Sequence, residues 1–296
     1  MNRWLGIGLI TISAASFGTL AIIGRYAYAA GLDVITLLFL RFGFSAAFML
    51  TFLALRKETL PQRHTLLQLA GMGGLGYVGQ SFCYMSAIQY ASAGLVALLL
   101  YLYPTFVTIL SVIFLKSKLT RWRISALALA TIGAALTANP QGGQWQGILL
   151  AILAAAIYAV YIIIGTRVMQ KVTALQSSTV IFSSAAIVFG GLTFFNGPNW
   201  PVSSAGWLAV AAIAVFSTII PVISFLAGLK IIGPTDASLL SVLEPVVTVG
   251  LAAVLFNENI QPAMLMGGGL ILVAVLLLTL AGRSPAALSE ELIEGR

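Results

Sequence analysis

The chain has 296 residues, of which 60% are hydrophobic and only 8% are charged, against roughly 25% charged residues in a soluble domain. Its mean hydropathy is +1.04, and apolar runs of about 20 residues, each long enough to cross a hydrocarbon core of roughly 30 Å, recur along its length. These values exclude an ordinary soluble protein and predict an all-α integral membrane protein.

Ten apolar segments, taken in chain order, are predicted to be transmembrane helices. They lie at residues 4–28, 34–55, 65–88, 93–115, 121–138, 145–167, 175–195, 204–229, 234–256 and 262–281. The first segment is too long for the apolar core of a cleavable signal, so we expect it to remain as a helix. The residues that follow Gly282 are polar, and we expect a C-terminal tail at 283–296.

The second half of the chain repeats the first half with a shift of 141 residues. Trp4-Leu5-Gly6-Ile7 recurs as Trp145-Gln146-Gly147-Ile148, and Pro104 falls on Pro245. One register held over most of the chain indicates an internal duplication. An odd number of spans in each copy gives the copies opposite orientations in the bilayer, which is typical of secondary transporters. We therefore predict two inverted five-helix repeats, at 1–141 and 142–282.

The formal net charge of +7 is explained by where the basic residues lie. All of the 15 Lys and Arg residues except Arg25 and Arg41 fall on the side of the N-terminus. By the positive-inside rule, both termini and the tail are expected to be cytoplasmic, in a bacterial inner membrane. The basicity is a topological signal, and we expect no nucleic-acid partner.

Motifs that resemble enzyme signatures have structural explanations here. The glycine-rich run at 71–76 lies inside an apolar span and has no following lysine, so we expect it to serve helix packing. Asp33 and Asp236 fall at predicted helix starts and are expected to be caps rather than a catalytic pair. A single cysteine, Cys83, and a single histidine, His64, exclude the usual zinc clusters and nucleophile pairs. We expect no enzyme activity, no metal and no cofactor.

Two prolines are expected to mark the centre of the membrane. Pro104 and Pro245 each lie about ten residues after a predicted helix start, which is about 15 Å and half the bilayer. Proline opens the helical hydrogen-bond ladder at the carbonyl four residues back, here that of Leu100 and Ser241. Such carbonyls need a partner or a polar cavity. A packed kink is the alternative, but two symmetry-related prolines favour a cavity between the repeats.

Two charged residues lie inside predicted spans. Glu244 is the only carboxylate deep in a span, and its repeat mate is Tyr103. An ionisable group at the midplane is costly and indicates function by default, with a structural, protonated carboxyl as the alternative. Arg41 lies about 10 Å below the outer surface. We expect its long side chain to snorkel outward or to pair with Glu244, in preference to binding a substrate directly.

Aromatic and polar residues recur at helical spacing on one face of four spans. These residues are Tyr77, Gln80 and Tyr84; Tyr101, Pro104 and Thr108; Tyr158 and Tyr161; and Ser238, Ser241, Pro245 and Thr248. A shared aromatic lumen is predicted from this pattern. For each tyrosine alone, packing in the protein core is the alternative to contact with a ligand.

Taken together, these features resemble the EamA-type transporters of the drug/metabolite transporter superfamily. The likeness extends to about Gly282 and rests on Trp4 and Trp145 in Trp-x-Gly starts, Phe17-Gly18, Arg41-Phe42, Leu102-Tyr103-Pro104 and Leu243-Glu244-Pro245. The resemblance implies ten helices in two inverted repeats. It also implies a central cavity bordered by the first, third, fourth, sixth, eighth and ninth helices.

The tyrosine-lined lumen is most similar to that of the aromatic amino acid exporter branch. The resemblance implies a monomeric secondary transporter in the lipid bilayer that exports amino acids, with aromatic or large apolar ones preferred, by alternating access. The residues expected to contact substrate are Phe17, Arg41, Tyr77, Gln80, Tyr84, Tyr101, Tyr103, Tyr158, Tyr161, Ser241 and Glu244, with Pro104 and Pro245 as helix breaks. Efflux of cationic lipophilic drugs or other metabolites and a membrane-embedded lipid enzyme are the alternatives. Proton antiport and facilitated diffusion both stay open.

Overall fold

The structure, a computed structural model, describes residues 3–115, 120–137, 145–258 and 260–281, and these residues form helices joined by short loops. The first half contains α1 (Arg3–Gly18), α2 (Leu20–Ala29), α3 (Val34–Leu55), α4 (Arg63–Gly71), the π-helix η1 (Met72–Tyr77), α5 (Val78–Tyr90), α6 (Ala93–Leu100), α7 (Tyr103–Leu115) and α8 (Arg121–Thr137). The second half contains α9 (Trp145–Val168), the short 3-10 helix η2 (Met169–Lys171), α10 (Ala174–Asn196), α11 (Ser204–Ala214), the π-helix η3 (Val215–Ile219), α12 (Ile220–Ser241), α13 (Leu243–Phe256) and α14 (Pro262–Ala281).

These helices combine into ten spans, as the sequence predicts. Within the described ranges, six stretches are long and apolar enough to cross a membrane on their own: Arg3–Ala29, Val34–Leu55, Ala93–Phe114, Trp145–Gly165, Ala174–Asn196 and Ser204–Ile232. The apolar helices at Leu243–Phe256 and Pro262–Leu278 are shorter. The two remaining spans are α4–η1–α5 and α8. The predicted all-α membrane class is confirmed.

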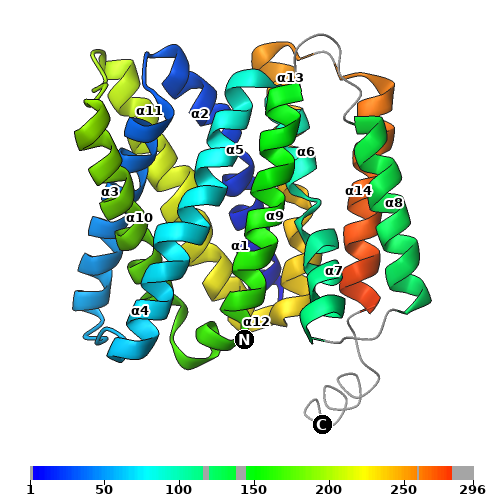
Figure 1. The fold of residues 1–296 in the computed structure, drawn as a ribbon, viewed down its shortest axis with the longest axis horizontal. Coiled ribbons are helices and arrows are strands. Elements are labelled where there is room, and N and C mark those ends of the chain that lie inside the picture. The colour runs from blue at the N-terminus through cyan, green and yellow to red at the C-terminus, as the bar shows by residue number, and fades with distance from the viewer. Residues whose placement is uncertain (1–2, 116–119, 138–144, 259, 282–296) are drawn as a thin grey trace.

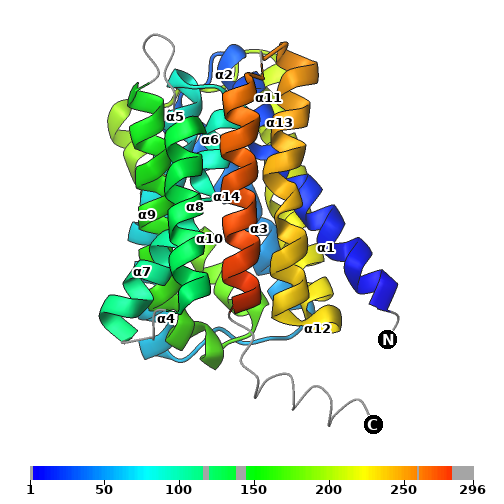
Figure 2. The same ribbon diagram turned by 90° about the vertical axis from the view of Figure 1, so that its right-hand side faces the viewer.

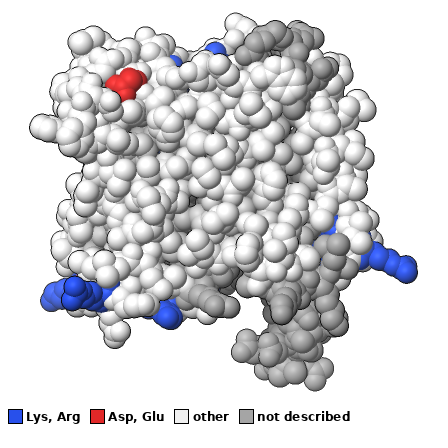
Figure 3. Space-filling model, in the orientation of Figure 1, with Lys and Arg blue, Asp and Glu red and all other residues white. Residues whose placement is uncertain are grey.

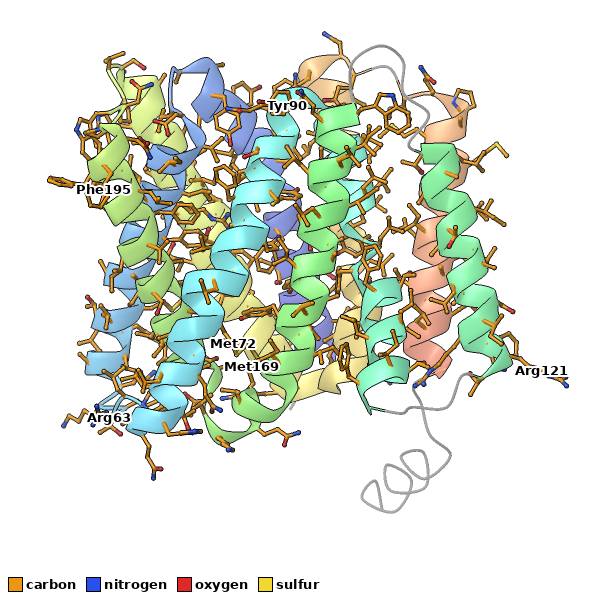
Figure 4. All side chains as sticks on the ribbon, in the orientation of Figure 1. Arg63, Met72, Tyr90, Arg121, Met169 and Phe195 are labelled. Carbon is orange, nitrogen blue, oxygen red and sulfur yellow. The ribbon has the colours of Figure 1, made fainter. Side chains whose placement is uncertain are left out.

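The two halves enter the bundle from opposite faces. In Figure 1, α1 begins and α14 ends at the lower face, whereas α9 begins at the upper face. Arg63 and Arg121 project from the lower face, and Tyr90 lies at the upper end of α5 (Figure 4). Figure 3 shows basic side chains along the lower edge, below a broad side surface almost without charge. This arrangement agrees with a bundle that lies in lipid and is built from inverted repeats.

One predicted helix boundary is wrong. The sequence predicts a loop at 230–233 and a new helix from Pro234, but α12 runs as one helix from Ile220 to Ser241. The chain nevertheless reverses within it, because Gly6 of α1 contacts Ile231 while Gly18, farther along α1, contacts Glu244 just beyond α12. The turn between two spans is therefore made with the backbone still helical. Asp236 lies in this stretch, and its side chain is outside the described part of the structure.

Other predictions about local structure are confirmed. Asp33 caps α3, because its carboxylate accepts hydrogen bonds from the amides of Ile35 and Thr36 at 2.8 and 2.9 Å. The glycine-rich run at 71–76 serves helix packing, since a Cβ at Gly73 would come within 2.7 Å of the carbonyl oxygen of Ile181 in α10. Small residues allow this close approach of helix backbones in lipid.

The α3 and α10 pair is tied at both ends by contacts that the duplication relates. At the upper end, the Asn199 side chain donates to the carbonyl of Gly31 at 2.9 Å. At the lower end, the hydroxyl of Thr173 donates to Glu58 at 2.8 Å. Glu58 and Asn199 are repeat mates at the shift of 141 residues. The α3 and α10 pair therefore forms a frame, and each of its ends is held by a loop that is the repeat mate of the loop at the other end.

The last helices of the two repeats, α8 and α14, lie side by side in both views (Figures 1 and 2) and pack closely. A Cβ at Gly267 of α14 would clash with the Thr137 hydroxyl and with the Gly133 carbonyl oxygen of α8. A Cβ at Gly269, two residues further on, would meet nothing within 4 Å.

This difference defines a matched pair of substitutions. We expect Gly267→Ala to destabilise the protein by about 1–3 kcal/mol, because the two backbones must separate to admit a methyl group. Gly269→Ala should be neutral or slightly stabilising, because alanine favours a helix over glycine. Thermal unfolding of both variants in detergent measures the effect, and equal unfolding midpoints would show that α8 and α14 do not pack as described.

Candidate functional site

A cavity of about 650 Å³ lies between the two halves of the chain. It is lined from the first, third, fourth, sixth, eighth and ninth spans, the six that the family resemblance implies. Two further spans also contribute, through Arg41 in α3 and through Val275 and Leu278 in α14. A cavity of this size at the repeat interface is suited to a small organic solute.

Most of the predicted site residues line this cavity together. They are Phe17, Arg41, Tyr77, Gln80, Tyr84, Tyr101, Tyr103, Pro104, Tyr158, Ser241 and Glu244. Two of the residues expected to contact substrate or break a helix are not among the lining residues. Tyr161 packs in the wall instead, with its ring centroid 5.9 Å from those of Tyr77 and Tyr158. Pro245 is buried in the first turn of α13. Of the wider lumen face, Thr248 instead donates to the carbonyl oxygen of Gly18 at 2.9 Å, while the Ser238 side chain lies outside the described part of the structure.

The helices break at the two prolines. The sequence predicts helix breaks at Pro104 and Pro245, and in the structure α6 ends at Leu100 before α7 begins at Tyr103, and α12 ends at Ser241 before α13 begins at Leu243. Pro104 and Pro245 therefore lie in first turns, where a missing amide donor leaves no hydrogen bond unmade. Both spans are discontinuous helices, the form in which transporters commonly build their midplane sites.

A hydroxyl satisfies the carbonyl that the second break exposes. Tyr101 donates to the carbonyl oxygen of Ser241 at 2.6 Å, and its hydroxyl lies 3.0 Å from a carboxylate oxygen of Glu244. The prediction that the Ser241 carbonyl needs a partner is thus confirmed, with the partner contributed by the other repeat. Glu244 reaches the cavity from the first turn of α13.

Tyrosine rings form a continuous wall along one side of the cavity. Tyr101 contacts Tyr103 with ring centroids 5.9 Å apart, Tyr103 contacts Tyr158 at 4.8 Å, and Tyr158 contacts Tyr161 at 5.9 Å. Tyr161 in turn contacts Tyr77. The first two contacts are edge-on, the third is stacked and the fourth is tilted, within the range of geometries that aromatic pairs prefer. The wall offers π-faces and hydroxyl groups to a bound solute.

Arg41 does not behave as the sequence predicts. Only 2% of the residue is exposed, so it does not snorkel to the surface. Its Nε donates to the hydroxyl of Thr218 at 2.9 Å. Within the described residues, the ion pair that forms is between Arg25 and Glu258, and Glu244 has no oxygen within 4.0 Å of the Arg41 guanidinium. The two charges share the cavity without pairing.

The lining follows the duplication, and this signal identifies a residue that sequence reasoning missed. Phe225 lines the cavity and is the repeat mate of Tyr84 at the shift of 141 residues. Phe17 and Tyr158 are also mates, as are Tyr103 and Glu244, and all four line the cavity. Applying the shift to each predicted tyrosine would have found Phe225.

Sequence reasoning also missed a cluster of contacts around Glu258 at the upper end of the bundle. The Glu258 carboxylate pairs with Arg25 and accepts hydrogen bonds from the amides of Ala93 and Gly94, at 3.1 and 3.4 Å, at the start of α6. The Arg25 guanidinium lies 4.3 Å from the centroid of the Phe256 ring. The only sequence signal was that Arg25 is one of two basic residues away from the N-terminal side. The cluster joins the first, fourth and ninth spans.

No group of three or more His, Cys, Asp or Glu side chains that could hold a metal ion occurs in the described ranges. Cys83 is buried and unpaired in α5. The functional groups of the cavity are the hydroxyls of tyrosine, serine and threonine side chains, the amide of Gln80, the guanidinium of Arg41 and the carboxylate of Glu244. This set can bind a solute by stacking, hydrogen bonding and charge.

Comparison with known proteins assigns the family. The model of the EamA-like transporter family matches residues 4–139 and again residues 145–280. An uncharacterized transporter of Archaeoglobus fulgidus is 28% identical, over 92% of this chain and 95% of its own length. The uncharacterized inner membrane transporter YedA of Escherichia coli K12 is 27% identical, over 81% of this chain and 79% of its own.

A solved crystal structure shares the fold, with a TM-score of 0.65 and 21% identity over 95% of this chain and 99% of that chain. The family matches cover both repeats, and they agree with a ten-span bundle built from two repeats. The chain belongs to the EamA-like transporter family and is a multi-pass membrane transporter, not an enzyme.

Proposed function

We propose that this transporter exports amino acids, with aromatic or large apolar ones preferred, by alternating access between its two repeats. The observation that carries the proposal is the tyrosine wall of a 650 Å³ cavity that also holds Glu244. Tyrosine rings stack on a substrate side chain, and the carboxylate of Glu244 attracts its ammonium group. Both halves of the pathway lie in one chain, so a monomer suffices.

Efflux of cationic lipophilic drugs is a second candidate, because one carboxylate among aromatic rings also suits a large organic cation. The two functions make different demands on the solute. An amino acid carries a carboxylate that such a cation lacks, and the cavity holds a guanidinium as well as a carboxylate. That guanidinium favours the amino acid.

We further propose that the protein lies in a bacterial inner membrane with both termini cytoplasmic, since the basic residues gather at the N-terminal face. Cysteine labelling of intact cells tests this, because the native Cys83 is buried. With a membrane-impermeant maleimide, N199C should be labelled and H64C should not; both positions are exposed. Labelling of H64C but not N199C would reverse the orientation.

Transport of labelled amino acids into proteoliposomes, with and without a pH gradient, tests the function itself. We expect phenylalanine, tyrosine, tryptophan and leucine to be transported in preference to small or charged amino acids. Alanine at Tyr84 or Tyr158 should weaken transport, by about 0.5–1.5 kcal/mol each for lost stacking. Alanine at Tyr101 should weaken it more, because it also leaves the Ser241 carbonyl oxygen without its hydrogen bond. Tyr90→Ala is the matched control, because Tyr90 lies on α5 with Tyr84 but is 48% exposed and outside the cavity.

Two outcomes would contradict the proposal. If no amino acid is transported while organic cations are, the drug-efflux candidate is correct. If all three tyrosine variants transport normally at normal expression levels, the pathway lies elsewhere in the bundle.

Glu244→Gln separates two roles for this carboxylate. Gln keeps the shape of the side chain and keeps a polar group beside the Tyr101 hydroxyl, but it has no charge. If Glu244 binds the ammonium group, apparent affinity for amino acids should fall. If it carries a proton, dependence on the pH gradient should vanish while exchange persists. Glu58→Gln, which removes a half-buried carboxylate at the lower face and outside the cavity, is the control. Unchanged affinity, rate and pH response would make Glu244 a structural residue.

A further inference from the structure

Arg41 lines the cavity, and its guanidinium is fixed along one edge. Its Nε is held by the Thr218 hydroxyl, which itself donates to the carbonyl oxygen of Ile213 at 2.9 Å. Thr218 belongs to the π-helix η3 of the eighth span. A guanidinium has five N–H donors, and this contact uses only one of them. Arg41 lines the cavity, so its other donors are available to a solute.

Arg41 has no counter-ion within the described part of the chain. The titratable side chains that interact with it electrostatically are all tyrosines: Tyr28, Tyr77 and Tyr84. Tyr77 and Tyr84 interact with Glu244 as well, and all four residues line the cavity. Burying a charge without a partner is costly, and such a charge inside a membrane usually marks a binding site.

The duplication shows that the fold does not need a charge at this position. The repeat mate of Arg41 is Phe182, and the mate of Thr218 is Tyr77. In one half of the molecule Arg41 contacts Thr218, and in the other half Phe182 contacts Tyr77 with ring centroids 6.0 Å apart. The same junction between helices is therefore built once from two aromatic rings and once from a guanidinium and a hydroxyl. Since rings suffice for packing, the guanidinium has a separate role.

We propose that Arg41 binds the carboxylate group of the transported solute. Two N–H groups of a guanidinium match the two oxygens of a carboxylate, a geometry that lysine cannot reproduce. This inference rests on the proposed function and deepens it. The cavity becomes a dipolar site, in which Arg41 takes the carboxylate and Glu244 the ammonium, with Tyr77 and Tyr84 in the same lining. The substrate class is then free α-amino acids, and the decarboxylated amines are rejected.

A matched set of ligands tests this assignment on the purified full-length protein. Binding is measured by thermal stabilisation in detergent and by competition with labelled phenylalanine in proteoliposomes. The ligands are L-phenylalanine, phenethylamine, which lacks the carboxylate, and 3-phenylpropanoate, which lacks the ammonium group. We expect the wild-type protein to prefer phenylalanine over phenethylamine on the order of 100-fold, because the amine leaves Arg41 unpaired.

Variants at Arg41 should remove this preference. Arg41→Met should lose most of its affinity for phenylalanine and for 3-phenylpropanoate but keep its affinity for phenethylamine, which also shows that it is folded. Arg41→Lys should be intermediate. Arg56→Met is the control, because it removes an exposed charge at the lower end of the same helix.

The outcomes distinguish failure of the Arg41 assignment from failure of the proposed function. If the wild-type protein binds phenethylamine as tightly as phenylalanine, or if Arg41→Met weakens both ligands equally, the Arg41 assignment is wrong and the proposed function stands. If no amino acid is transported but 3-phenylpropanoate binds in a manner that depends on Arg41, the proposed function is wrong and the carboxylate site stands. If neither carboxylate ligand binds, both are wrong.

Discussion

The hydrogen bond from the Tyr101 hydroxyl to the carbonyl oxygen of Ser241 joins the two repeats where their backbones are interrupted. In hydrocarbon a bare carbonyl costs several kcal/mol, so a span can break at mid-membrane only where another group satisfies the exposed backbone. Tyr101 does so from across the repeat interface, and the break in turn brings Glu244 to the cavity. The cavity, its carboxylate and the meeting of the two halves thus depend on one requirement of backbone chemistry.

The rest of the bundle supports this centre in two ways. The α3 and α10 pair is held at both ends by repeat-related loops, and α8 packs on α14 through glycines. The cluster around Glu258 adds a tie between the first, fourth and ninth spans at the upper end. The molecule therefore combines a frame tied at its periphery with interrupted helices at its centre, which is the division of labour that alternating access requires.

Much of this could be predicted from the sequence, because the dominant signals are local or periodic. Apolar runs revealed the spans, the helical period brought Tyr77, Gln80 and Tyr84 to one face, and the 141-residue shift indicated the interface. The failures involve contacts between distant segments. Tyr161 has the right period, but its ring is taken up by Gly76 and Tyr77 of a neighbouring span.

The same limit applies to charge. Depth alone could not show that Arg41 meets Thr218, 177 residues further on, nor that Arg25 meets Glu258 at a separation of 233 residues. Arg41 was expected to reach the surface because lone charges usually do so. The helix boundary predicted near Pro234 was wrong for another reason. A Gly-Pro pair usually indicates a loop, but here the chain reverses while α12 stays helical.

The presence of one guanidinium and one carboxylate in the same cavity also has an electrical consequence. When both groups are ionised, their charges cancel, so the described lining is neutral overall. Moving a net unit charge across the bilayer exchanges roughly 2.3 kcal/mol with every 100 mV of membrane potential. A zwitterion held between Arg41 and Glu244 would cross with no such exchange, whereas an amine would cross as a cation and its flux would follow the voltage. The direction of zwitterion transport would then be set by the solute gradient and by any coupled proton, with the membrane potential acting only on the latter.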